Sequence, residues 1–156
     1  MIRIRIIAPG KDKDEWVTLG SHHYIKLLSR YARVELVVLP SLKLSSSLSP
    51  DEIRKKEAVP LSKQLRGGYC VALSDSGKKY DSRAFADFVE KRQVAGNDAI
   101  EFIVGGPYGL DNDLLNQADT VLSLSSLTFP HKLVRLILLE QLYRAFSILH
   151  NTSYHK

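Results

Sequence analysis

The sequence predicts one α/β domain, a mostly parallel sheet flanked by helices, because strand-like and helix-like segments alternate five times. Several of the strand-like segments are short and mostly apolar, as buried parallel strands are, and the first has the alternating pattern of a strand. No Pro/Gly-rich linker divides the 156 residues, a length that fits one domain covering 1–156.

The first half contains two predicted strands and two predicted helices. Isoleucine alternates with arginine in the first strand, and apolar residues recur at helical spacing in the first helix. Ser49-Pro50-Asp51-Glu52 is a capping box with proline at the first helical position, so a helix begins there. Pro60 then predicts two short helices or one kinked helix ending near Arg66. The ranges are Ile2–Ala8 and 33–39 for the strands, 14–31 for the first helix and 41–49 for a serine-rich loop, a candidate lid.

The second half continues the alternation with three strands and three helices. Asp75-Ser76-Gly77 predicts a turn, and Asp81 or Ser82 is expected to cap the next helix, which Gly96 ends. The predicted strands are 69–73, 100–104 and 120–124, and the last two helices are 111–118 and 132–149.

The final helix is apolar around nearly its whole circumference, so it must be buried on more than one side. One interpretation is an interface between two copies of the chain, which predicts a homodimer. The other is a central helix in the core of a monomer.

Composition limits the classes of function that the chain can have. The net charge of +5 and the pI near 9.3 suit a polyanionic partner such as RNA. The single cysteine, Cys70, lies in an apolar run and is interpreted as a buried structural thiol rather than a nucleophile. No metal site is expected, because the histidines have no ligand spacing. No run is apolar enough to span a membrane, and the N-terminus does not resemble a signal peptide, so a cytoplasmic location is expected.

Ligands of open α/β sheets bind at the carboxyl ends of strands, where three loops stand out. The loop 73–78 follows the third strand, Gly105-Gly106-Pro107-Tyr108-Gly109 follows the fourth, and 124–131 follows the fifth. Glycines allow a close ligand approach, although a plain tight turn would use them too. In 124–131, apolar side chains suit an adenine, whereas the alternative is an ordinary loop capped by Thr128. The spacing is not GxGxxG, which argues against a dinucleotide oxidoreductase.

Three segments carry a resemblance to a known family. VALSDSGK, FIVGGPYGL and the stretch from LSLSSLTFPHK to NTSYHK are similar to the SPOUT-class large-subunit rRNA pseudouridine methyltransferases, the RlmH family, over essentially the whole chain. The sequence departs from the usual pattern at Ser74, often aspartate; at Ser153, often proline; and in the loop 42–48, which has only Lys43 as a basic residue. Because Ser153 replaces the proline, we expect a less rigid tail.

The resemblance implies a C-terminal trefoil knot, a homodimer and S-adenosylmethionine as cofactor. It further implies methylation of N3 of a pseudouridine in 23S rRNA of the assembled ribosome. A side chain at Gly105 is expected to crowd the cofactor. By motif match, the implied cofactor contacts are Leu73, Gly105, Leu124, Ser125, Ser126, Leu127, Thr128 and Phe129.

The C-terminal tail supplies the candidate catalytic residues. His155 is the candidate base or orienting group, and Tyr154 is expected to pack against or hydrogen-bond the target base. Arg144 is expected at RNA phosphate or at the dimer interface, and Lys156 at phosphate. His131 lies beside the predicted cofactor loop, where it either takes part in the site or only stabilises the start of the helix. Alternative functions are methylation of another RNA such as tRNA, or a ribosome-binding factor without catalysis.

Overall fold

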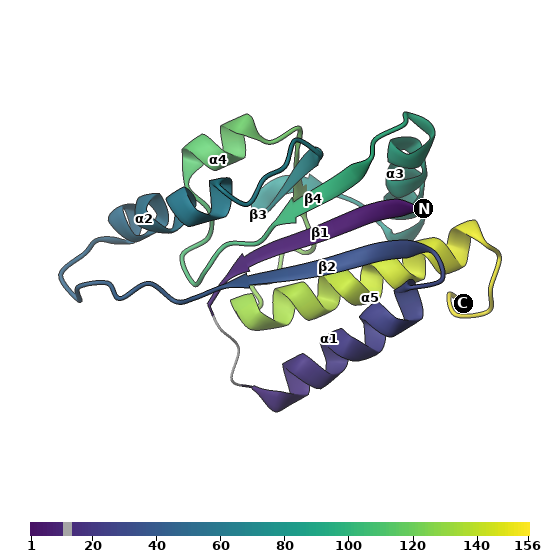
Figure 1. Ribbon diagram of the computed structural model, residues 1–156, viewed down its shortest axis with the longest axis horizontal. Coiled ribbons are helices and arrows are strands. Elements are labelled where there is room, and N and C mark those ends of the chain that lie inside the picture. Colours follow the sequence, from purple (N-terminus) through teal and green to yellow (C-terminus); the bar gives the residue numbers. More distant parts are fainter. Residues whose placement is uncertain (11–13) are drawn as a thin grey trace.

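Five parallel strands form one sheet in the order β2-β1-β4-β3-β5 (Figure 1). The computed structural model describes residues 1–10 and 14–156. The α/β alternation predicted from the sequence is confirmed. The elements are β1 Ile2–Pro9, α1 Glu15–Leu28, β2 Ala32–Leu39, α2 Pro50–Ser62, β3 Tyr69–Lys79, α3 Ser82–Val94, β4 Ala99–Ile103, α4 Asn112–Gln117, β5 Thr120–Ser123 and α5 His131–Leu149.

The helix α2 begins as the capping box predicts. The backbone N–H of Glu52 donates to Ser49 Oγ over 3.2 Å, and the backbone N–H of Ser49 donates to Glu52 Oε2 over 2.7 Å. Pro60 remains inside this single helix, so the two-helix alternative is wrong. The proline lies in the last turn, where its missing N–H removes one hydrogen bond close to an end that frays in any case.

The turn predicted at 75–77 is wrong, because β3 continues to Lys79. Leu73 and Lys78 are both register partners of Leu122 on β5, so the four residues between them bulge out of the ladder and the strand then resumes. Asp75, Ser76 and Gly77, which suggested a turn, lie in this bulge instead.

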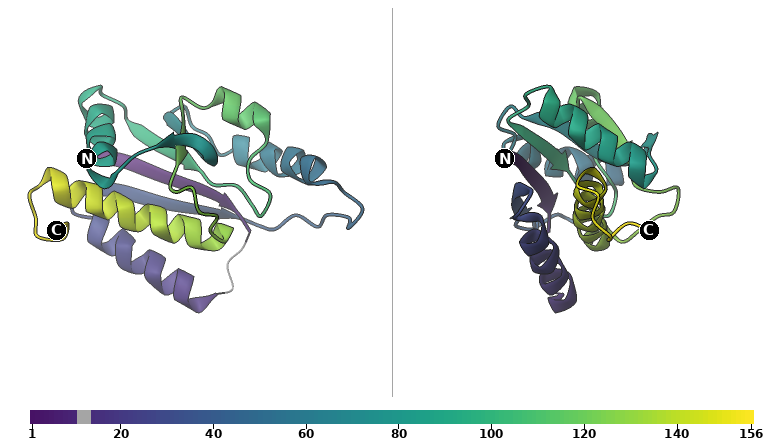
Figure 2. Two further views of the ribbon diagram at one scale, coloured as in Figure 1. Left: turned by 180° about the vertical axis from the view of Figure 1, so that it is seen from behind. Right: turned by 90° about the vertical axis from the view of Figure 1, so that its right-hand side faces the viewer.

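The two faces of the sheet are covered by different helices. The larger core packs one face against α1, α3 and α5, and it includes Ile4, Ile6, Phe102 and Phe146. The smaller core packs the other face against α2 and α4. Figure 2 shows α5 running alongside α1 across the strands. These layers leave the carboxyl ends of the strands free for loops.

Packing within one chain explains why α5 is apolar around nearly its whole circumference. Every residue from His131 to Leu149 is buried or half-buried, because the helix packs on the sheet between α1 and α3. The monomer-core interpretation of this helix therefore accounts for the pattern, and the homodimer needs support from elsewhere. Within 1–10 and 14–156, none of the helices is long and apolar enough to cross a bilayer.

Candidate active site

A cavity of about 330 Å³ lies where the bulge of β3 meets the loops after β4 and β5. All strands are parallel, so their carboxyl ends share one edge of the sheet, and the loops after β4 and β5 converge there with the bulge of β3. The volume lies in the range of sites for small organic ligands. The sequence prediction that these three loops form one site is consistent with this cavity.

Seven of the eight residues expected to contact a cofactor line the cavity: Leu73, Gly105, Leu124, Ser125, Leu127, Thr128 and Phe129. Ser126 is exposed and is absent from the lining. Leu127 lines the cavity while 71% of its surface is exposed, which leaves an apolar side chain available to cover a ligand. Ser125 holds the loop in shape, because its Oγ accepts from the backbone N–H of Leu127 over 3.0 Å.

The glycine loop after β4 is tightly folded. Gly109 has a φ of +81°, and its N–H donates to the carbonyl of Gly106 over 3.0 Å. A Cβ on Gly105 would lie 2.5 Å from the carbonyl carbon of Gly109. A side chain at Gly105 would therefore distort the loop itself, in addition to any crowding of a ligand.

Helix α2 supports this loop from outside. Arg54 Nη1 donates to the carbonyl of Tyr108 over 3.1 Å, and Arg54 also pairs with Asp51. One turn further along α2, the carboxylate of Glu57 lies 2.6 Å from the place where a Cβ of Gly106 would be. Burial raises the pKa of Glu57. The glycine loop is thus held between its own hydrogen bond and two side chains of α2.

Sequence reasoning missed several lining residues. Arg54 comes from α2 and Val134 from α5, and neither position carries a sequence signal, because their approach depends on how the helices pack. Ser74 and Asp75 also line the cavity. They were not named as contacts, although they fall in the segment 73–78, which the sequence predicted to be a loop at the site and which forms the bulge of β3.

The C-terminal tail folds back onto α5. Tyr154 Oη donates to Glu140 Oε1 over 3.1 Å, and the rings of Tyr154 and Tyr143 meet edge-on at 4.7 Å. Arg144 Nη1 lies 3.3 Å from His155 Nδ1, while Arg144 Nη2 pairs with Glu140 over 2.6 Å. Burial and the neighbouring carboxylate raise the pKa of Tyr154, so its hydroxyl stays protonated. The two candidate catalytic residues, Tyr154 and His155, are therefore linked through contacts with Arg144 and Glu140, although Arg144 had been expected at RNA phosphate or at the dimer interface.

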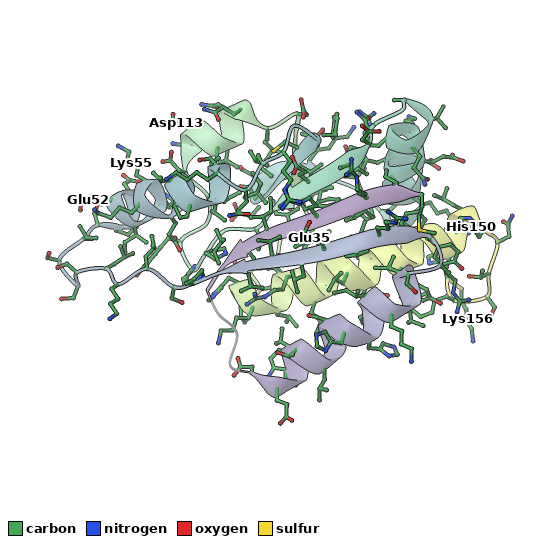
Figure 3. All side chains as sticks on the ribbon, viewed as in Figure 1. Glu35, Glu52, Lys55, Asp113, His150 and Lys156 are labelled. Carbon is green, nitrogen blue, oxygen red and sulfur yellow. The ribbon has the colours of Figure 1, made fainter. Side chains whose placement is uncertain are left out.

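The tail and the cavity lie at opposite ends of the molecule. Helix α5 starts at the cavity, which His131 lines, and its 19 residues span about 28 Å before the tail begins. In Figure 3 the exposed Lys156 accordingly lies far from Glu52, which marks the end of the molecule where the loops converge. The structure does not bring the tail to the cavity of its own chain.

Cys70 is buried, as the sequence predicts, and lies outside the cavity lining. Burial, with Asp119 and Glu101 nearby, raises the pKa of its thiol to about 11. Among the described residues, no group of three or more histidine, cysteine or acidic side chains is arranged to hold a metal ion.

Comparisons with known proteins agree with this architecture. The family model described as "Predicted SPOUT methyltransferase" matches residues 2–155. A ribosomal RNA large subunit methyltransferase H from Alkaliphilus oremlandii is 42% identical, and the match covers 99% of this chain and 100% of the relative. The protein of the same name from Acetivibrio thermocellus is 41% identical, again over 99% and 100%.

Solved structures show the same fold at low sequence identity. A probable methylase family protein from Haemophilus influenzae aligns with a TM-score of 0.54 and 15% identity, over 99% of this chain and 70% of that one. The tRNA (m1G37) methyltransferase from Aquifex aeolicus aligns with a TM-score of 0.53 and 14% identity, over 92% and 69%. With the full-length family match, these findings lead to one conclusion: the chain belongs to the SPOUT methyltransferases, in the family of the ribosomal RNA large subunit methyltransferases H.

Proposed function

We propose that this chain transfers a methyl group from S-adenosylmethionine to N3 of a pseudouridine in 23S rRNA of the assembled ribosome. The observation that carries the proposal is the cavity at the three converging loops, in a chain whose full-length relatives are named as rRNA methyltransferases. A ribosomal substrate implies a cytoplasmic location.

The cavity lining fits the cofactor. Apolar side chains from the loop after β5, among them Leu124 and Phe129, suit an adenine ring, and the loop backbone suits its polar edge. Arg54 and Asp75 bring opposite charges to the same cavity, which suits the carboxylate and ammonium groups of the methionine part. The bound cofactor would supply an electrophilic methyl group on a sulfonium.

The protein's contribution to the reaction is chiefly to position the acceptor. As the N–CH₃ bond forms and the S–CH₃ bond would break, N3 loses its proton to solvent water, and the sulfur would leave with its electron pair as S-adenosylhomocysteine. Holding N3 in line with the methyl carbon supplies most of the rate enhancement in such a step.

His155 acts as an orienting group in this scheme. A guanidinium has only donors, so Arg144 Nη1 requires His155 Nδ1 to be an acceptor. A neutral imidazole then carries its proton on Nε2, which makes that nitrogen a donor toward a carbonyl or a phosphate. In this arrangement His155 does not take the N3 proton, and Tyr154, with its raised pKa, does not take it either.

We further propose that the active enzyme is a homodimer whose tails act across the interface. The length of α5 separates the cavity from the tail of the same chain by about 28 Å, so a tail that touches the acceptor must serve the cavity of the partner. The trefoil knot that the family resemblance implies and the assignment of 1–156 as a single domain are parts of this proposal.

Two measurements test the proposal. Calorimetry with purified protein should detect S-adenosylmethionine binding, and a non-catalytic ribosome-binding factor would show none. Mass spectrometry of rRNA and tRNA from a deletion strain should show the loss of one methylpseudouridine from 23S rRNA. Loss of a methyl group from tRNA, with 23S rRNA unchanged, would replace the proposed substrate by the tRNA alternative.

A further inference from the structure

A second groove, of about 420 Å³, lies at the end of the sheet opposite the cofactor cavity. It opens beside the amino ends of β1, β3 and β4, on the face that α2 and α4 cover further along. The eight residues of β1 separate the two ends by about 26 Å. Figure 1 shows that the N-terminus marks this end and that the C-terminal tail lies at it too.

Strand register places two arginines side by side at the mouth of the groove. Arg3 on β1 is the direct partner of Arg33 on β2, so their side chains leave the same face of adjacent parallel strands. Both are exposed, and neither takes part in an ion pair within the described part of the chain. Like charges directly opposite on neighbouring strands destabilise a sheet. A bound anion would offset this repulsion.

Small residues leave room beside the two arginines. Arg3 is flanked on β4 by Ala99, and next to Ala99 lies Gly68, where a Cβ would come within 2.9 Å of the Ala99 carbonyl oxygen. The row of side chains across this face thus consists of two cations followed by two of the smallest residues. This is a basic recess rather than a flat surface.

In contrast to Arg3 and Arg33, the next arginine along β1, Arg5, is paired with carboxylates. Arg5, with 5% of its side chain exposed, donates to Glu35 over 2.9 Å and to Glu101 over 2.6 Å. Glu101 also accepts from the backbone N–H groups of Arg66 and Gly68. Arg5 and Arg66 are thereby neutralised by Glu101 and Glu35, whereas Arg3 and Arg33 face only Asp98 among the remaining acidic groups of the lining.

Arg5 itself keeps one donor without a partner. Arg5 Nη2 is buried and has no hydrogen-bond partner among the residues that the structure describes. Buried donors are nearly always paired in folded proteins. Because this atom is covered by the protein, the donors that the groove offers a ligand are those of Arg3 and Arg33.

We propose that this groove, hereafter the Arg3–Arg33 groove, binds phosphate groups of the RNA backbone and positions the substrate at a distance from the methyl donor in the cavity of its own chain. The inference rests on the proposed RNA substrate. Arginine is the side chain best suited to phosphate oxygens, and the volume exceeds what one phosphate needs, as a run of phosphodiester chain requires. The groove lies at the same end of the molecule as the tail that is proposed to handle the acceptor.

The test compares the double variant Arg3→Ala/Arg33→Ala with the matched variant Arg83→Ala/Lys91→Ala. The matched pair removes the same charge from exposed positions on α3, on the other face of the sheet. With ribosomes from a deletion strain as substrate, the groove variant should raise KM at least about 10-fold, while kcat at saturation and the affinity for S-adenosylmethionine stay unchanged. The salt dependence of binding, as log K against log [salt], should become shallower by about 1.5 for two lost phosphate contacts.

The variant Arg3→Lys/Arg33→Lys keeps both charges and should retain most of the salt slope. Equal KM and equal slope in the groove variant and the wild type would overturn the proposal, as would an equal loss in the α3 variant. Saturable binding of inorganic phosphate below about 1 mM, without any effect of the substitutions on ribosome binding, would assign the groove to a free anion instead.

If the proposed function were wrong, the experiments would give a different result from the one expected if only the groove proposal were wrong. The wild-type protein would then methylate no ribosomes, and a 23S rRNA fragment titrated with wild type and groove variant would still report on the groove. A shallower salt slope in that titration supports the Arg3–Arg33 groove whatever the reaction is, and an unchanged slope overturns it.

Discussion

Arg144 Nη1 lies 3.3 Å from His155 Nδ1, and the same guanidinium is held by Glu140. This contact makes Nδ1 of His155 the acceptor, so Nε2 is the donor in the neutral ring. We predict that His155→Ala lowers kcat about 10- to 100-fold and that His155→Gln restores much of it. The glutamine amide can donate from nearly the position of Nε2 but cannot act as a base.

The measurement is kcat on ribosomes for both variants, together with its pH profile. A base would contribute about 10²–10⁴-fold, and its loss would leave glutamine as inactive as alanine. Equal inactivity of His155→Gln and His155→Ala would therefore return His155 to the role of general base. Binding of S-adenosylmethionine serves as the control and should be the same in all three proteins.

The separation of tail and cavity predicts complementation between subunits. One inactive form lacks Tyr154 to Lys156, and the other carries Thr128→Trp, which fills the cavity from an exposed position on its lining. Mixed dimers contain one intact cavity facing one intact tail, so mixing the two should restore up to half of the wild-type activity per mixed dimer. No recovery, in mixtures shown by mass spectrometry to have exchanged subunits, would mean that the tail serves its own chain.

The glycine loop predicts unequal effects of two adjacent substitutions. Gly105→Ala forces a Cβ against the backbone of Gly109 at 2.5 Å, so the loop must distort, and we expect at least a 10-fold loss of cofactor affinity. Gly106→Ala meets only the carboxylate of Glu57, the far end of a flexible side chain, and should cost much less. Calorimetry with S-adenosylmethionine measures both.

Adding Glu57→Ala to each glycine variant provides a control. Glu57→Ala removes the side chain that Gly106→Ala would meet, so the double variant should bind the cofactor better than Gly106→Ala alone. The same removal should leave Gly105→Ala as weak as before. Rescue of both glycine variants, or of neither, would contradict the contacts described for this loop.

The sequence alone could predict the α/β alternation and the three loops of the cavity. Periodicity identifies strands and helices one at a time, and parallel strands bring their carboxyl ends to one edge whatever their order. Local signals such as the capping box at Ser49 also depend only on neighbouring residues, and the structure confirms that box.

What the sequence could not predict depends on pairing between distant segments. The Arg3–Arg33 groove exists because β1 and β2 pair in a register that places these two arginines opposite each other. The bulge at 74–77 requires β5 as its partner, and without β5 the same residues look like a turn. Likewise, Arg54 reaches the glycine loop only through the packing of α2.

The environment of Cys70 predicts an unreactive thiol. Its side chain lies in the core beneath α2 and α4, and burial, with the carboxylates of Asp119 and Glu101, raises its pKa to about 11. Because the thiolate is the reactive form, iodoacetamide at pH 8 should label the folded protein far more slowly than the same chain in guanidinium chloride. As the sequence has one cysteine, mass spectrometry reads this site directly.

The raised pKa of Cys70 also predicts how the free energy of unfolding changes with pH. The unfolded thiol ionises near pH 9, whereas the folded one holds its proton to about pH 11, so between these values the folded state binds more protons. Stability from this group is therefore fully present below about pH 9 and is lost as the pH rises toward 11. The variant Cys70→Ala lacks this group, so its melting temperature should fall less than that of the wild type between pH 9 and 11. Parallel decline of the two proteins, or fast labelling of the native thiol at pH 8, would mean that Cys70 is more accessible than its packing indicates.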